Sequence, residues 1–249
     1  MQFLSIKLVP SVIMGVIFAF SSYVNAKSPE FIKICEHTST DCLRESLQAT
    51  LPGFLRGAPD LGIDSMDPFQ VNNLNLTLPG GLTISFNEGV ATGFRKCIID
   101  KARMIKDSLD IQLHCNLTIR GKYMSTGRLL MFPIDGHGDS LIKCRNIRLG
   151  ALVKLGSKMQ HSEKYLDVKS LKVNHKFQGR VSYQMTNLFK GNPEISKLVL
   201  EFMNSNWRLV AEEFGKPIVD FGVSSIMTNV NQLFRVVPMK DLLSGPVDL

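Results

Sequence analysis

The sequence has no apolar run long enough to cross a membrane. The longest run, residues 8–20 (LVPSVIMGVIFAF), is well short of the roughly 20 residues that a membrane-spanning helix requires. No later segment is apolar for that length. We therefore expect no stable insertion of the mature chain into a membrane.

Motifs for metal or cofactor chemistry are also missing. The sequence has no CxxC pair and no HExxH segment, and no two of its five histidines are four residues apart. Zinc sites need Cys or His ligands at short, characteristic spacings. We therefore expect no metal and no cofactor.

One short stretch carries residue types suited to catalysis. Residues 132–141 (FPIDGHGDSL) include Asp135, His137, Asp139 and Ser140. The sequence contains no GxSxG motif, which would expose a catalytic serine on a nucleophile elbow. Because the two glycines permit the positive φ of a tight loop, we predict a hairpin turn here and no enzyme activity.

Charge of one sign is not concentrated in any segment. Lys and Arg outnumber Asp and Glu by 29 to 22, which gives a formal net charge of +7. The basic residues form no block of five, and no aromatic residues are interleaved with them as in surfaces that stack nucleic-acid bases. A solvated basic surface is favoured, and nucleic acid is disfavoured as a partner.

The N-terminal segment has the features of a secretion signal. Lys7 is the only charge in residues 1–26, the apolar run follows it, and Val24 and Ala26 occupy the −3 and −1 positions of a cleavage site. This pattern is typical of a signal peptide. Since no Pro/Gly/Ser-rich linker divides the remainder, we predict a single domain over residues 27–249, secreted into an extracellular fluid.

Five cysteines follow, and the secretory route allows disulfides to form. Cys35 and Cys42 would close a short loop before a helix, worth about 2.5 kcal/mol by loop entropy, and we predict this bond. The odd number leaves at least one thiol unpaired. The pairing of Cys97, Cys115 and Cys144 stays open.

Apolar and polar residues alternate along the middle of the chain. Leu113, Cys115 and Leu117 share one face of a predicted strand, and Asn116 lies on the other. The sequon asparagines Asn75 and Asn116 both fall on polar faces, where a glycan can be accommodated. Similar patterns predict strands at residues 74–78, 82–86, 90–100, 109–120, 127–134, 141–155 and 165–185.

The spacing of these strands predicts an antiparallel meander. Several strands are long, and the apolar phase slips between Cys144 and Ile147. Such a slip indicates β-bulges and strong bending of the sheet.

Helical periodicity flanks the sheet region. A first helix is predicted over residues 41–55, with Asp41 as its N-cap. A longer repeat covers residues 194–234, which at about 1.5 Å per residue approaches ~60 Å, and Pro217 is predicted to bend or break it. Since an ordinary globule cannot contain such a helix, a long curved sheet must wrap along it.

An ordered set of segments resembles the insect takeout and juvenile-hormone-binding protein family, of the tubular lipid-binding (TULIP) superfamily. The segments are GKYMSTGRLLMFPIDGHGDS, YLDVKSLKV, TNLFKGNPEISKLVLEFMNSNW and FRVVPMKDLL, behind Cys35 and Cys42, and together they cover residues 31–243. The resemblance implies an α+β fold. In this fold, a strongly curved antiparallel sheet wraps a long C-terminal helix and encloses an apolar tunnel. The resemblance also implies that Cys35 and Cys42 form the disulfide of the family.

The resemblance also implies a carrier, secreted into haemolymph or another extracellular fluid, of a small lipophilic ligand such as a juvenile-hormone-like terpenoid or a fatty acid. The alternative is an interaction or signalling protein. Its tunnel would be filled by its own side chains, and its basic surface would meet a receptor, a membrane or a microbial lipid. For the carrier, we expect the tunnel to be lined by Leu113, Cys115, Leu117, Leu130, Phe132, Val173, Phe177, Phe202, Leu209, Phe214 and Phe221.

Overall fold

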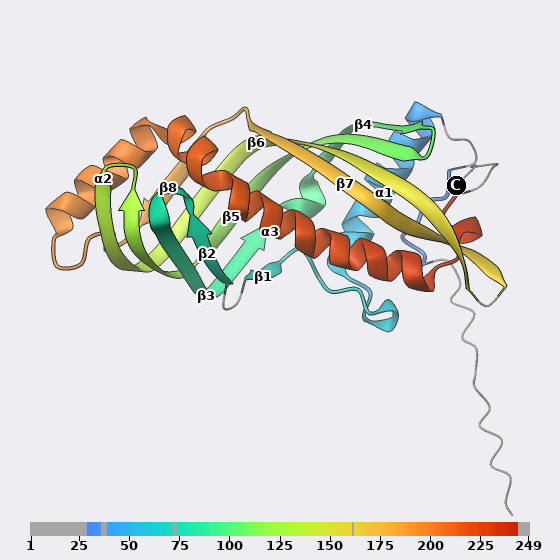
Figure 1. Ribbon diagram of the computed structural model, residues 1–249, viewed down its shortest axis with the longest axis horizontal. Helices are drawn as coiled ribbons and strands as arrows, with labels where there is room; N and C mark the ends of the chain where they lie inside the picture. Colours follow the sequence, from blue (N-terminus) through green and yellow to red (C-terminus); the bar gives the residue numbers. More distant parts are fainter. Residues whose placement is uncertain (1–28, 36–38, 72–73, 161, 244–249) are drawn as a thin grey trace, which may run out of the picture.

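The computed structural model describes residues 29–35, 39–71, 74–160 and 162–243. These residues form an elongated body in which a curved sheet partly surrounds a long helix (Figure 1). This is the fold class that the sequence predicts. The predicted signal peptide, residues 1–26, lies outside the described residues.

Eight antiparallel strands of the described chain form the sheet, in the order β1-β3-β5-β6-β7. Strand β2 pairs with β3, β4 with β5, and β8 with β6. The strand bounds are β1 Phe69–Val71, β2 Leu74–Leu78, β3 Leu82–Thr92, β4 Ile98–Ile105, β5 Ser108–Leu129, β6 Phe132–Gln160, β7 Glu163–Phe177 and β8 Val181–Met185.

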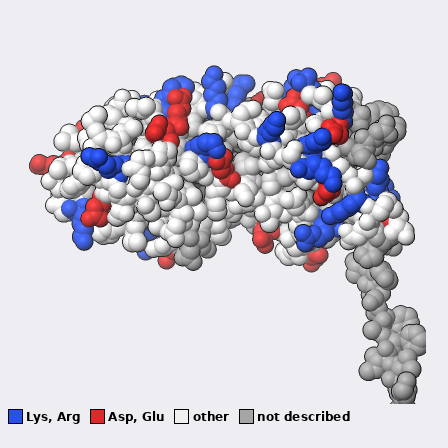
Figure 2. Space-filling view, in the orientation of Figure 1, with Lys and Arg blue, Asp and Glu red and all other residues white. Residues whose placement is uncertain are grey.

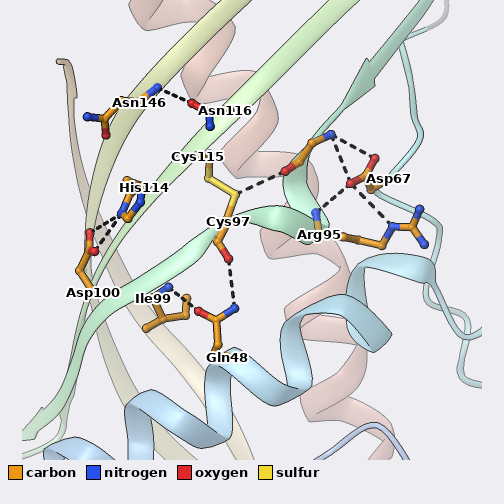
Figure 3. Close-up of a disulfide and its surroundings, with 11 residues drawn as sticks. Gln48, Asp67, Arg95, Cys97, Ile99, Asp100, His114, Cys115, Asn116 and Asn146 are labelled. Carbon is orange, nitrogen blue, oxygen red and sulfur yellow. Dashed lines mark hydrogen bonds and ion pairs between the residues drawn. A yellow bond between two sulfur atoms is a disulfide. The ribbon is translucent and has the colours of Figure 1, made fainter. Parts of the chain in front are cut away.

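Strands β5 and β6 form the spine of the sheet, with 22 and 29 residues. Their register shifts between Cys115 and Leu117, opposite the segment between Ile147 and Cys144. In this bulge Asn146 has a φ of 48°, and its N–H donates to Asn116 Oδ1 at 2.8 Å (Figure 3). The irregularity predicted from the apolar phase slip is confirmed.

The hairpin turn predicted at residues 135–139 is wrong. These residues lie within β6 and pair with residues 122–126 of β5, and the chain reverses earlier, between Leu129 and Phe132. Glycine is needed at these two positions because residues 186–188 pass close to the backbone of β6. A Cβ on Gly136 would lie 2.5 Å from the carbonyl oxygen of Asn187, and one on Gly138 would lie 2.3 Å from Thr186 Oγ1.

The strand predicted over residues 90–100 is also divided. Strand β3 ends at Thr92, and a 3₁₀ turn, η3 (Phe94–Lys96), precedes β4. The buried carboxylate of Asp67 holds this turn, because it accepts hydrogen bonds from the N–H groups of Gly93 and Arg95 at 3.2 and 2.8 Å (Figure 3). Residues 178–180 similarly divide the last predicted strand into β7 and β8.

The helices differ from the prediction in their caps and in one break. The Ser39 side chain caps α1 by accepting from the N–H of Cys42, and Asp41 lies in the first turn. The long C-terminal repeat breaks at Asn206, whereas the helix continues through Pro217. The bounds are α1 Thr40–Arg56, α2 Pro193–Ser205, α3 Trp207–Val236, and the 3₁₀ turns η1 Pro59–Leu61, η2 Pro79–Gly81 and η4 Met239–Asp241.

The side chain of Asn206 explains the position of the break. Both its Nδ2 and its backbone N–H donate to the carbonyl of Phe202, and such local bonding by asparagine competes with helix propagation. Pro217 instead leaves the carbonyl of Glu213 without its helical partner. Because Glu213 is exposed, water can satisfy that carbonyl.

Helix α3 closes the concave side of the sheet. It contacts β7 at one edge and β2 near the other, so it spans the opening that the curved strands leave (Figure 1). Helix α1 covers the end near β4, and α2 packs on β8 at the opposite end. This arrangement creates an enclosed space along the molecule.

Candidate ligand-binding cavity

An internal cavity of ≈ 480 Å³ lies between the concave face of the sheet and helices α1 and α3. Its wall is contributed by aliphatic and aromatic side chains, with no Lys, Arg, His, Asp or Glu among the described lining residues. This volume falls within the roughly 300–1,000 Å³ of typical small-molecule sites. The cavity is the candidate functional site.

The alternation of the strands places apolar side chains on the wall. In β2, Leu74, Leu76 and Leu78 line the cavity, and Asn75 between them is exposed. In β5, Cys115 and Leu117 line it, and Asn116 is exposed on the outer face. The period of two thus separates the cavity wall from the sequon asparagines.

Helix α3 supplies the opposite wall through its helical period. Val210, Phe214 and Ile218 line the cavity, and Lys216 and Asp220 form an ion pair on the exposed face, with Nζ and Oδ2 2.5 Å apart. The helix is therefore apolar toward the sheet and charged toward water, as expected for a helix that covers a core.

The structure brings together most of the predicted lining residues. Seven of them lie on the cavity wall: Leu113, Cys115, Leu117, Val173, Phe177, Phe214 and Phe221.

The prediction is wrong for four residues, which are not on the cavity wall: Leu130, Phe132, Phe202 and Leu209. Leu130 lies in the β5–β6 turn with a φ of 54°, and Phe132 packs edge-on against Phe202, with ring centroids 5.0 Å apart. Leu209 is 50 % exposed. On both helices the buried position comes one residue later, at Met203 and Val210.

Two disulfides link cysteines in the described part of the chain. Cys35 is joined to Cys42, the pair that the sequence predicts, and Cys97 is joined to Cys115. The sequence left the second pairing open, and both of its cysteines line the cavity. A signal for it exists in the sequence, because a β4–β5 hairpin that pairs Ile98 with His114 places the preceding Cys97 opposite Cys115.

Helix α1 is fixed to the wall beside this disulfide. The side chain of Gln48 donates to the carbonyl of Cys97 at 3.1 Å and accepts from the N–H of Ile99 at 2.7 Å (Figure 3). Sequence reasoning did not identify Gln48, since a lone glutamine on a helix carries no specific signal. The side-chain amide of Gln48 thus provides hydrogen-bond partners for two backbone groups at the start of β4.

Polar side chains are rare on the wall. Two lining residues carry hydroxyl groups, Thr50 and Tyr183, and the hydroxyl of Thr50 accepts a hydrogen bond from the N–H of Lys33 at 3.2 Å. Cys144 contributes a free thiol. Burial raises the pKa of that thiol to about 12, so it is uncharged at physiological pH.

The residues considered for catalysis do not converge. Asp135, His137 and Asp139 are exposed, whereas Ser140 is buried and its hydroxyl donates to the carbonyl of Gly121 at 3.1 Å. Within the described ranges, no three Cys, His, Asp or Glu side chains are grouped as metal ligands. No helix in the described part of the chain combines the length and apolarity that a membrane span needs.

Most charged side chains of the described residues lie on the outside of the molecule, and Asp67 is a buried exception. In Figure 2, Lys and Arg gather over the half that carries α1, and the surface around α2 is mostly uncharged. Strands β6 and β7 contribute exposed lysines to the surface, namely Lys143, Lys154, Lys158, Lys164, Lys169, Lys172 and Lys176. An outside rich in basic residues thus surrounds an uncharged cavity.

A curved sheet closed by a long helix around an apolar cavity defines a tubular lipid-binding fold. The chain belongs to the family described as "Haemolymph juvenile hormone binding protein (JHBP)", whose model matches residues 13–244.

Relatives and solved structures agree with this assignment. The chain is 22% identical to "Circadian clock-controlled protein daywake" of Drosophila melanogaster, over 84% of this chain and 86% of that protein. It is also 22% identical to the protein of the same name from Drosophila yakuba, over 93% and 95% of the two chains. The crystal structure of Epiphyas postvittana Takeout 1 matches with a TM-score of 0.81 and 28% identity, over 86% of this chain and 100% of that one.

Proposed function

We propose that this protein is a secreted, non-enzymatic carrier that holds a small lipophilic ligand, such as a terpenoid or a lipid of fatty-acid size, in its internal cavity. The observation that carries the proposal is the enclosed space of ≈ 480 Å³ with an uncharged, almost wholly apolar wall. An apolar ligand enters such a space because its surface leaves water. Burial of about 400 Å² contributes on the order of 10 kcal/mol before ordering costs.

The size of the cavity favours the carrier over a protein whose tunnel is filled by its own side chains. At about 24 cal/mol per Å³ of unfilled volume, a permanently empty space of ≈ 480 Å³ would forfeit on the order of 10 kcal/mol of packing. That is comparable to the whole stability of a domain. A ligand that fills the space recovers these contacts.

Three features support an extracellular site of action. Residues 1–26 have the pattern of a signal peptide, and the two disulfides are typical of proteins that fold outside the cytosol. The sequon asparagines Asn75 and Asn116 are both exposed, and we assign them as glycosylation sites. The family description, which names a haemolymph protein, agrees with secretion.

A single substitution in the wall tests the carrier function. Leu113 lines the cavity from β5, so in Leu113→Trp the indole should occupy space that the ligand uses. We expect an apolar fluorescent probe, N-phenyl-1-naphthylamine, to bind the wild type and to bind Leu113→Trp at least tenfold more weakly. The melting temperature should change little, because the new side chain enters open space.

The matched control is Gln112→Trp, which places the same side chain on the exposed face of the same strand. It should bind the probe as the wild type does. In a filled core, overpacking at Leu113 would cost about 1–3 kcal/mol of stability. A large drop in the melting temperature of Leu113→Trp, or normal melting with unchanged probe affinity, would refute the proposal.

A further inference from the structure

The pairing of β6 with β7 gathers basic side chains that lie apart in the sequence. Residues 140–160 contain five Lys or Arg and residues 168–182 contain four, and neither range contains Asp or Glu. In the ladder, Arg148 lies opposite Lys176, and Lys154 lies opposite Ser170. The two strands therefore form a basic ribbon, without acidic residues along most of their paired length.

The alternation of both strands points three of these cations away from the cavity. The odd-numbered residues of 147–155 on β6 and residues 171, 173 and 177 on β7 line the cavity, so the residues between them face outward. Arg148, Lys172 and Lys176 therefore lie on the convex outer face, and all three are exposed. Helix α3 lies on the opposite, concave side of the sheet (Figure 1).

The positive charge of this face is not neutralised within the described chain. The acidic residues of β4, of β5 and of the turn between them form ion pairs with other bases, namely Asp100 with His114, Asp107 with Lys154 and Asp110 with Arg103. None of the described carboxylates forms an ion pair with Arg148, Lys172 or Lys176. Because Arg148 and Lys176 lie directly opposite each other, their like charges are destabilising, and an anion bound between them would offset the repulsion.

Protection of the sheet edge accounts for only part of this pattern. Strand β7 is the last in the strand order, and lysines on an edge strand hinder pairing with a second chain. Arg148 lies on β6, however, which pairs with β5 on one side and β7 on the other. Edge protection does not explain Arg148, whose planar guanidinium is suited to binding two oxygens of one oxyanion.

The shape of the ribbon favours a chain-like polyanion over a membrane. The basic residues of β6 extend from Lys143 to Lys158, about 50 Å of strand at ~3.3 Å per residue. A flexible chain can follow these strands around the convex face, whereas a flat bilayer would contact only part of it. Outside the cell, where we place this protein, the polyanions of this form are sulfated glycans.

We propose that the outer face of the β6–β7 ribbon binds a sulfated glycan, whose chain lies along the strands and whose sulfate groups bind Arg148, Lys172 and Lys176. The site lies on the face opposite the cavity, so a glycan and a cavity ligand can bind together. The inference is independent of what the cavity holds. Such binding would keep the protein at glycan-coated surfaces.

The fluorescence anisotropy of a labelled heparin dodecasaccharide measures this interaction. The wild type should bind it at about 0.1 M NaCl, where the Debye length is ~10 Å, and more weakly as salt is added. In Arg148→Gln/Lys172→Gln/Lys176→Gln, affinity should fall on the order of tenfold, because charge-assisted hydrogen bonds to sulfate are lost. The salt dependence should also be less steep, since fewer counterions are released.

A second triple variant, Lys122→Gln/Lys190→Gln/Lys197→Gln, is the matched control. It has the same net charge, and its substituted residues are also exposed. They lie outside the ribbon, on β5, before α2 and on α2. This variant should bind the dodecasaccharide within about twofold of wild type. Melting temperatures no lower than that of wild type establish that both variants are folded.

Two competitors identify the partner. At an equal concentration of anionic groups, neither the desulfated dodecasaccharide nor vesicles of phosphatidylcholine and phosphatidylserine should displace the labelled chain. Any of three results would overturn the inference. These are no binding of the labelled chain by the wild type, equal weakening in the two triple variants, and displacement of the chain by either competitor.

Discussion

Cys144 is the cysteine that the two disulfides leave free. Its thiol lines the apolar cavity, and burial there disfavours the thiolate. Because the thiolate is the reactive form, the position of this residue determines its chemistry. An isolated cysteine in the sequence gives no indication of which environment it will meet.

We predict that Cys144 resists alkylation in the folded protein. With its pKa raised by burial to about 12 from an ordinary value of 9.0, it has roughly a thousandfold less thiolate at pH 8 than an unperturbed cysteine. Iodoacetamide labelling, followed by intact-mass spectrometry, should be negligible in buffer and rapid in denaturant. Complete labelling of the native protein within minutes at pH 8 would show that the thiol is accessible and ionised.

Inward-facing residues were predictable where the local period is simple. Leu113, Cys115 and Leu117 follow strict alternation, and all three line the cavity. On the helices, apolar residues also occur side by side, and the helical period alone does not decide which of two neighbours faces inward. Phe202 and Leu209 were predicted to line the cavity, whereas the buried positions are Met203 and Val210, because tertiary packing fixes the inward direction.

Helix α3 is attached to the rest of the chain by a polar contact as well as by its apolar face. Asn229 is 3% exposed, and its side chain satisfies both backbone groups of Asp64. Its Oδ1 accepts from the N–H at 3.2 Å, and its Nδ2 donates to the carbonyl at 2.7 Å. This contact ties the C-terminal part of α3 to the segment that follows α1.

We expect Asn229→Ala to lower the free energy of unfolding by about 3 kcal/mol, because two backbone groups lose their partners at a buried position. Urea denaturation monitored by circular dichroism measures the change. Glu213→Ala, on the exposed face of the same helix, serves as the control and should stay within ~0.5 kcal/mol of wild type. Equal denaturation midpoints for the two variants would show that the Asn229 contact does not anchor α3.

The elements themselves were largely predictable, and their junctions were less so. The long C-terminal helical repeat was correct in extent, but Asn206 breaks it and Pro217 does not. Gly136 and Gly138 suggested a turn, yet they lie within β6, where residues 186–188 leave no room for a side chain. The helix break follows from a local hydrogen bond, from Asn206 Nδ2 to the carbonyl of Phe202. The need for glycine in β6 follows from a segment distant in sequence, and local patterns do not contain that information.

At the scale of the whole molecule, two long strands and one long helix determine the architecture. Strands β5 and β6 set the length of the sheet, their bulge accompanies its curvature, and α3 closes the concave side (Figure 1). Charged side chains are exposed on the face that Figure 2 shows, and the described cavity wall carries no charged side chain. The fold thus offers an apolar ligand an apolar, uncharged interior.

Native mass spectrometry tests the central claim most directly, namely that a lipophilic molecule occupies the cavity. The protein, purified without detergent, should have a native mass greater than its denatured mass by the mass of a small lipid. Extraction with organic solvent should remove the excess and release a lipid in near-equimolar amount. A native mass equal to the denatured mass, unchanged after incubation with apolar lipids, would contradict the account.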